Sequence, residues 1–106
     1  MEKYTLISAV ADKDSYAANE YGTITVVTTE DVSKIRIGYK NAATYKTKTA
    51  TYQTTSSNVE SVVTEDGITT WTIRYKFTVP AEDDRFEVQC RGANWGEAKI
   101  ITATVS

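Results

Sequence analysis

The segment from Thr69 to Pro80 carries the strongest structural signal in the chain. Apolar side chains occupy every second position, and the positions between them hold threonine or a basic residue. The apolar set is Trp71, Ile73, Tyr75, Phe77 and Val79, and the polar set is Thr70, Thr72, Arg74, Lys76 and Thr78. Successive side chains of a β-strand point to opposite faces, so this alternation predicts a strand with one face buried and the other in water. Nothing in the segment points to catalysis.

Composition narrows the chemistry open to the chain. Its 106 residues fit one domain, which we expect to span residues 1–106. The sequence contains no histidine and a single cysteine, Cys90. These two facts exclude zinc sites and Ser-His or Cys-His catalysis within the chain, together with an intrachain disulfide. We therefore expect a protein that is not an enzyme and that carries neither cofactor nor metal.

The charge pattern argues against two further classes of partner. There are 12 basic and 14 acidic residues, with both signs mixed along the chain, so no basic stripe is available for nucleic acid. No apolar run approaches the roughly 20 residues that a membrane helix needs, and no signal-peptide pattern is present. We expect neither nucleic-acid binding nor membrane insertion.

Seven other segments share the pattern of short β-strands separated by turn residues. They are residues 4–11, 23–29, 34–40, the threonine-rich 41–58, 59–64, 85–91 and 97–105. The polar stretches 12–22, 81–84 and 92–96 are interpreted as connections, the first with room for one helical turn. Asp66 and Gly67 lie between two strand patterns and predict a hairpin turn.

This arrangement of strands leads to predictions for several individual residues. The threonine-rich segment predicts an edge strand, with Lys46 and Lys48 discouraging unwanted strand pairing. Tyr45 and Tyr52 are expected to pack at that edge. Cys90 alternates with Phe86 and Val88 on an inward face, which predicts a small buried side chain and not a reactive thiol.

This number and spacing of strands predicts an all-β, immunoglobulin-like antiparallel β-sandwich of seven to eight strands. A closed eight-stranded barrel is the main alternative. The uneven loops and the weak middle segment favour the sandwich.

Two runs of sequence carry a resemblance to known modules. The run Phe86-Glu-Val-Gln-Cys-Arg-Gly-Ala-Asn-Trp-Gly96 resembles the penultimate strand and loop of fibronectin type III and bacterial immunoglobulin-like modules. Val32-Ser-Lys-Ile-Arg-Ile37 together with Trp71-Thr-Ile-Arg-Tyr75 is similar to immunoglobulin-like repeats of secreted and surface proteins of Gram-positive bacteria. The resemblance implies a module in an extracellular or cell-surface protein.

Immunoglobulin-like strand order would bring three loops, residues 29–33, 65–67 and 92–96, to one end of the sandwich. The candidate ligand-binding residues there are Trp95, Asn94, Asp31 and Asp66, accompanied by Glu30, Glu65 and Glu97. A tryptophan surrounded by carboxylates and an amide can stack on a sugar ring while the polar groups bind its hydroxyls. The alternative is that Trp95 folds down and closes the open end of the sandwich.

Acidic and amide side chains are also expected to gather at the opposite end. They are Asp12, Asp14, Asn19, Glu20, Glu82, Asp83 and Asp84. Such oxygen ligands suit Ca²⁺. Without a metal-binding spacing, however, ordinary turn chemistry is the better interpretation.

Two hypotheses on function follow. The first is a non-catalytic module of a larger extracellular or cell-surface bacterial protein, serving as a spacer or adhesion unit, with neighbouring domains and a protein or glycan ligand as partners. The second is a carbohydrate-binding module that uses Trp95. A decoration protein of a virion or appendage with the same fold stays open.

Overall fold

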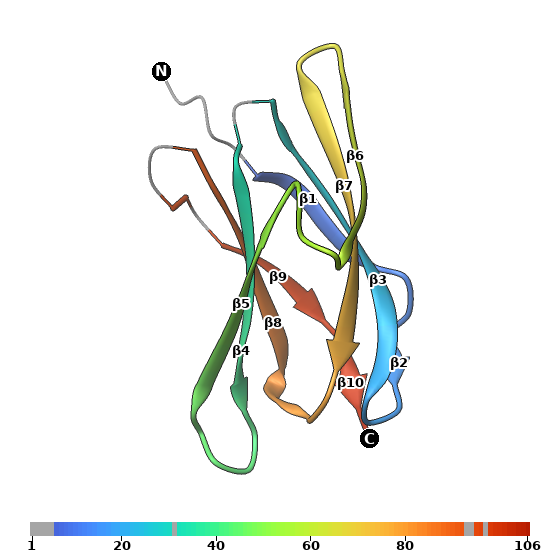
Figure 1. The fold of residues 1–106 in the computed structure, drawn as a ribbon. Coiled ribbons are helices and arrows are strands. Elements are labelled where there is room, and N and C mark those ends of the chain that lie inside the picture. Colours follow the sequence, from blue (N-terminus) through green and yellow to red (C-terminus); the bar gives the residue numbers. More distant parts are fainter. Residues whose placement is uncertain (1–5, 31, 93–94, 97) are drawn as a thin grey trace.

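The computed structural model describes residues 6–30, 32–92, 95–96 and 98–106. The described part contains ten β-strands and no helix (Figure 1). The strands are β1 (Leu6–Ala11), β2 (Ser15–Tyr16), β3 (Glu20–Thr29), β4 (Lys34–Asn41), β5 (Thr47–Gln53), β6 (Val59–Glu65), β7 (Ile68–Phe77), β8 (Ala81–Arg91), β9 (Lys99–Thr102) and β10 (Thr104–Val105).

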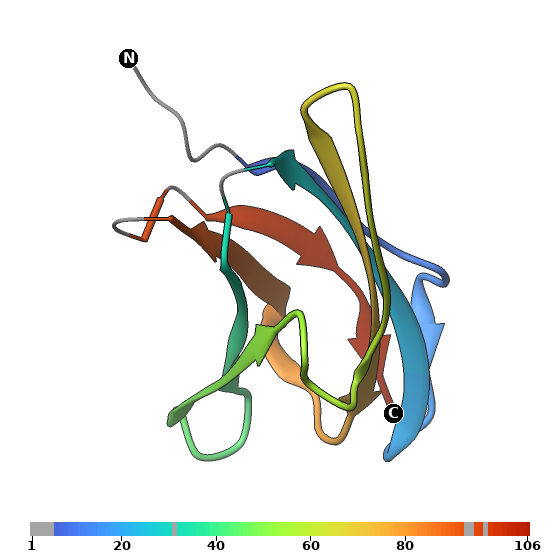
Figure 2. The ribbon, with the colours of Figure 1, turned by 45° about the horizontal axis from the view of Figure 1, so that its top comes forward.

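Two four-stranded sheets face each other. Their strand orders are β1-β3-β7-β6 and β5-β4-β8-β9, and every pairing within them is antiparallel. The chain passes from one sheet to the other between β3 and β4, between β5 and β6, and between β7 and β8 (Figures 1 and 2). This arrangement is the immunoglobulin-like β-sandwich that the sequence predicts. The short β2 and β10, which pair in parallel, were not anticipated.

Strand β7 lies inside its sheet and has the predicted faces. Trp71, Ile73 and Phe77 are fully buried, and Arg74 and Lys76 are exposed. The indole Nε1 of Trp71 donates a buried hydrogen bond to Thr28 Oγ1 over 3.3 Å. The alternation therefore identified both the strand and its buried face.

The core draws on both sheets. Its largest fully buried side chains are Trp71, Tyr16, Phe77, Phe86, Ile24, Ile35, Ile37, Ile73, Val26 and Val88, with Cys90 among the smaller ones. Phe77 and Phe86, from opposite sheets, meet edge to face with ring centroids 5.2 Å apart. This aromatic contact links the two sheets across the core.

The predicted connection 12–22 is wrong, because it contains β2 and the first residues of β3. Tyr16 is buried, and its ring stacks on Phe77 at 3.9 Å between centroids and 7° between planes. Gly22 lies beneath that ring, since a Cβ placed on it would come within 2.5 Å of Tyr16 Cε1. This glycine serves close approach inside a strand and does not mark a turn.

The predicted turn at 81–84 is also wrong, because these residues begin β8. Ala81 is buried and pairs with Asn41 across the sheet. Asp83 and Asp84 both have φ of 56°, so their left-handed backbone is accommodated inside the strand. The last predicted strand is interrupted at Ala103, whose N–H donates to Asp84 O over 3.0 Å.

The hairpin and the edge strand agree with the sequence. Asp66 and Gly67 have φ of 53° and 79°, as a two-residue hairpin turn requires. β5 is an edge strand. Tyr52 packs into the core, whereas Tyr45 lies in the turn before β5 with 63% of its surface exposed, so only one of the two tyrosines packs.

Candidate functional site

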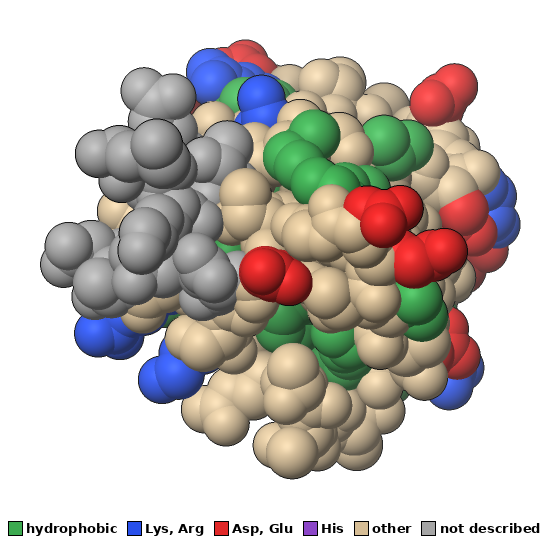
Figure 3. Space-filling model, turned by 90° about the horizontal axis from the view of Figure 1, so that it is seen from above, with side chains coloured by type: hydrophobic (Ala, Val, Ile, Leu, Met, Phe, Trp, Pro, Cys, Tyr) green, Lys and Arg blue, Asp and Glu red, His purple; other side chains and the backbone are tan. Residues whose placement is uncertain are grey.

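The β3–β4 connection, the β6–β7 turn and the end of β8 lie toward the same end of the sandwich, as immunoglobulin-like strand order implies (Figure 1). The N–H of Glu30 donates to Gly67 O over 3.2 Å, and the N–H of Ser33 donates to Arg91 O over 2.7 Å. The β3–β4 connection therefore contacts the β6–β7 turn and the last residue of β8. Viewed from this end, the described surface shows acidic side chains beside hydrophobic ones (Figure 3).

The structure describes two of the four candidate residues at this end, Asp66 and Trp95. Asp31 and Asn94 lie outside the described residues, as does Glu97. Asp66 is exposed in the hairpin turn between β6 and β7. Trp95 is half-buried.

Trp95 lies against the outer face of the β5-β4-β8-β9 sheet. It forms an isolated antiparallel bridge with Arg91, and the N–H of Gly96 donates to Cys90 O over 3.0 Å. The amide Nε2 of Gln89 donates to Gly96 O over 3.0 Å. Trp95 and Gly96 thus lie alongside β8, and Trp95 does not close the end of the sandwich.

Arginine side chains cover the indole ring of Trp95. The Arg36 guanidinium carbon lies 4.1 Å from the ring centroid, and that of Arg91 lies 5.8 Å away. Guanidinium groups at such distances interact favourably with the ring face. Arg36 therefore already occupies one face of the tryptophan, which reduces the free platform for a sugar.

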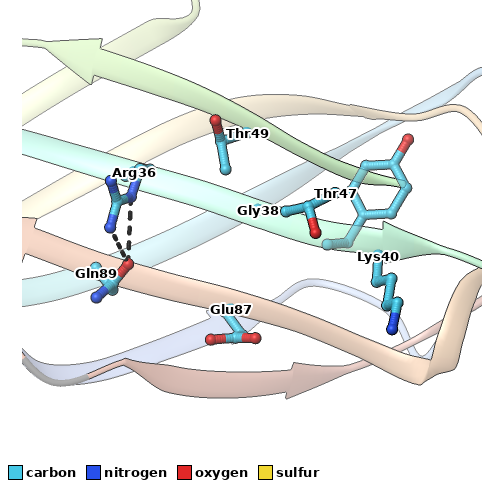
Figure 4. Close-up of a pocket in the computed structure, with 8 residues that line it drawn as sticks. Arg36, Gly38, Lys40, Thr47, Thr49, Glu87 and Gln89 are labelled. Atoms are coloured by element: carbon cyan, nitrogen blue, oxygen red, sulfur yellow. Dashed lines mark hydrogen bonds between the residues drawn. The ribbon is translucent and has the colours of Figure 1, made fainter. Parts of the chain in front are cut away.

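A groove of about 400 Å³ begins beside Arg36 on the same outer face (Figure 4). Its lining comes from β4, β5 and β8: Arg36, Gly38, Tyr39, Lys40, Thr47, Thr49, Glu87 and Gln89. Gly38 pairs with Thr49 on one side and Glu87 on the other, and its missing side chain leaves the floor open. A glycine at an outward position of the interior strand β4 thus adds no side chain to the groove, and the Thr49 methyl lies close to where its Cβ would be.

Hydrogen bonds and charges give the groove a mixed polar character. Arg36 Nε donates to Gln89 Oε1 over 3.2 Å, and one terminal amino group of Arg36 donates to the same oxygen (Figure 4). Lys40 Nζ lies 3.9 Å from a Glu82 carboxylate oxygen, and both side chains are exposed, so this ion pair contributes little stability. Arg36 thus joins the groove to Trp95. The signal in the sequence that could have indicated the groove is Gly38, an isolated glycine inside an otherwise regular strand pattern.

Two of the acidic residues predicted at the opposite end, Asp12 and Glu20, have structural partners. Asp12 Oδ1 accepts a hydrogen bond from the Tyr16 hydroxyl over 2.6 Å and another from the Thr23 N–H over 3.1 Å. The Tyr16 hydrogen bond is the main cause that lowers the pKa of Asp12. Glu20 forms an ion pair with Lys13. Within the described ranges, no three His, Cys, Asp or Glu side chains are grouped to hold a metal ion.

Comparison with known proteins leaves the family open. No family model matches the chain, and no curated protein matches it. A solved structure titled "Crystal structure of Dpr1 IG1 bound to DIP-eta IG1" is similar, with a TM-score of 0.44 and 13% identity over 97% of this chain and 95% of that one. Similarity at this level says nothing about a ligand. No helix among the described residues is long and apolar enough to cross a membrane.

Proposed function

We propose that this chain is a non-catalytic immunoglobulin-like interaction module of a larger extracellular or cell-surface bacterial protein. It binds a protein partner through the outer face of the β5-β4-β8-β9 sheet. The observation that carries this proposal is the groove floored by Gly38 and continued by the stacked Arg36 and Trp95. A hollow of this kind gives a partner side chain a place to insert.

The residue types on this face favour a protein partner. Arginine, tryptophan and tyrosine dominate the binding energy of protein interfaces. Arg36, Arg85 and Arg91 point outward from adjacent strands, because their neighbours Ile35, Phe86 and Cys90 point into the core. Since Arg36 is already held by Gln89 and Trp95, little conformational entropy is lost when a partner binds it.

The shape of the module supports a place within a series of domains. The described chain is elongated, with extents of 40 × 24 × 21 Å. The C-terminus lies at the end opposite the β6–β7 turn, and β1 begins on the side of that turn (Figure 1). Neighbouring domains joined at opposite ends would leave both sheet faces accessible, which suits a spacer that also binds. The absence of histidine supports a role other than catalysis.

A carbohydrate-binding function is the second candidate. Trp95 is half-exposed beside a polar groove of about 400 Å³, which falls within the usual size range of small-ligand sites. A glycan would have to use the face of the indole that Arg36 leaves open. We rank this function below protein binding for that reason.

The test compares a blocked groove with a matched change on the other sheet. Thr49→Arg fills the groove from edge strand β5, and Ser61→Arg places the same side chain at an exposed position of edge strand β6. Proteins captured from the surface fraction of the producing cell are each measured against both variants by surface plasmon resonance. The proposal predicts a partner whose Kd rises at least about tenfold with Thr49→Arg only.

Two results would contradict the proposal. One is that every captured protein binds Thr49→Arg and Ser61→Arg equally well. The other is that soluble glycans shift the emission of Trp95 and are excluded by Thr49→Arg while no protein shows that dependence. This second result would establish the carbohydrate-binding function in its place.

A further inference from the structure

A second hollow lies between the two sheets and shares Tyr39 and Thr49 with the lining of the outer-face groove. It has a volume of about 250 Å³ and is lined by Tyr21, Tyr39, Lys48, Thr49, Ala50, Tyr52, Asn58, Tyr75 and Lys76. The pairing of β6 with β7 ends at Val59 and Ile73, so the lower part of β7 has no strand beside it on this side. The hollow, which we call the tyrosine cleft, opens between that part of β7 and edge strand β5.

Two phenol groups in the tyrosine cleft have no protein partner. Tyr52 and Tyr75 are only 8% and 6% exposed, and neither hydroxyl has a hydrogen-bond partner among the described residues. No described side-chain oxygen is both fully buried and unpaired, so both hydroxyls keep some contact with solvent, and both residues line the cleft. Tyr39 differs, because its hydroxyl is 3.1 Å from Thr78 Oγ1. Nearly buried polar groups that face a hollow are positioned to bind a ligand.

The charges around the tyrosine cleft have one sign. Lys48 and Lys76 line it, and its lining includes no aspartate or glutamate. Desolvation raises the pKa of both Tyr52 and Tyr75, so their phenols stay protonated and able to donate at neutral pH. Two ammonium groups and two phenol donors together suit a carboxylate, because charge-assisted hydrogen bonds are the strongest of their kind.

The remaining lining groups suit hydroxyl groups of a sugar. Asn58 Nδ2 donates to Arg74 O over 3.2 Å, which leaves its carbonyl oxygen free to accept. Thr49 and the tyrosines can both donate and accept, as sugar hydroxyls require. The exposed ring of Tyr21 at the rim is covered by the Arg74 guanidinium at 4.1 Å. The volume lies below the range for drug-sized ligands, so the cleft fits one ring of a longer chain.

We infer that the tyrosine cleft binds an acidic sugar, namely a pyranose residue with a carboxylate such as a uronic acid within a glycan. The carboxylate lies beside Lys48, which pairs with the inward-facing Tyr39, and accepts hydrogen bonds from Tyr52 and Tyr75. Lys76 lies on the opposite face of β7 from Tyr75, over the Tyr21 ring, and adds positive charge at the rim. The cleft shares Tyr39 and Thr49 with the lining of the outer-face groove, but Tyr52, Tyr75 and Lys48 line the cleft alone. Substitutions of these three residues leave the groove lining unaltered, so either proposal can fail without the other.

The test uses an oligogalacturonate of three residues, with a neutral galactose oligomer of equal length for comparison. Titration calorimetry measures both, and backbone amide shifts map where the acidic sugar binds to the unaltered chain. We expect binding of the acidic oligomer only, weakened by salt, with shifts centred on residues 48–52 and 75–76. Tyr52→Phe and Tyr75→Phe keep the rings and remove only the hydroxyls, and each should weaken binding about fivefold.

Charge and control variants complete the experiment. Lys48→Gln should weaken binding at least about tenfold, and the exposed Tyr45→Phe and Lys46→Gln should leave it unchanged. Equal binding of the neutral oligomer, or shifts elsewhere on the chain, would overturn the inference. A glutamate-rich peptide that shifts the cleft residues while the acidic sugar does not would replace the sugar with a peptide ligand.

Discussion

Gly22→Ala probes the stacked rings that hold the lower half of the sandwich together. The added methyl would lie 2.5 Å from Tyr16 Cε1, 2.8 Å from Phe77 Cε1 and 2.9 Å from Tyr16 Cζ. The Tyr16 ring cannot easily move away. Its hydroxyl donates to Asp12 and accepts from the Lys13 N–H, and its face rests on Phe77.

The expected loss of stability follows from two opposed effects. Overpacking of a core by one methyl typically destabilises by about 1–3 kcal/mol, and the pinned ring places this site near the upper end. Replacing glycine by alanine also restricts the unfolded chain, which stabilises by about 0.4–1 kcal/mol. We therefore expect Gly22→Ala to lower the free energy of unfolding by about 1.5–2.5 kcal/mol.

Gly38→Ala is the matched control in a second strand. Its nearest contact would be Thr49 Cγ2 at 2.8 Å, on an exposed side chain that can rotate, followed by Lys48 O at 3.2 Å. This variant should change stability by less than about 1 kcal/mol. Urea denaturation followed by circular dichroism measures both. The reasoning is refuted if Gly22→Ala is as stable as the unaltered chain, or if both variants lose the same amount.

Three further predictions concern the core, an acidic residue and the site. Trp71→Ala should lower stability by about 3–5 kcal/mol and Thr72→Ala by less than about 1 kcal/mol in chemical denaturation, and equal losses would reverse the assigned faces. The pKa of Asp12 lies below 3.8 in the folded chain, so the stabilisation from its carboxylate is present above that pH and disappears as the pH falls further. Asp12→Asn should therefore weaken the acid dependence of the unfolding free energy, and an unchanged slope would contradict this. Arg36→Ala should increase acrylamide quenching of Trp95, and unchanged quenching would rule out the stacked geometry.

The sequence predicted those features that depend on neighbouring residues. Alternation along β7 and β8 identified their buried faces, because side-chain period is a local property of a strand. Asp66 and Gly67 predicted the hairpin turn, because the backbone conformation of a turn also depends on the residues within it. The sequence failed where aspartate, usually a turn residue, was placed within a strand, as at Asp83 and Asp84. Both residues have the positive φ that is typical of a turn, yet they lie within β8.

The candidate site needed contacts between distant segments, and the sequence could supply only part of it. The sequence singled out Trp95 as a candidate, but the orientation of its ring depends on Arg36, which belongs to a different strand of the sheet. The groove depends on Thr49 and Glu87 flanking Gly38, and that register is set by pairing across three strands. Asp31 and Asn94 stay predictions.

Amide hydrogen exchange in the presence of the partner tests most directly which face of the module binds. The chain is measured alone and with the protein captured through the Thr49→Arg comparison. The proposed function predicts added protection in Lys34–Asn41, Thr47–Gln53 and Ala81–Arg91, which form the outer-face groove. Protection confined to Glu20–Thr29 and Ile68–Phe77 of the other sheet would contradict it.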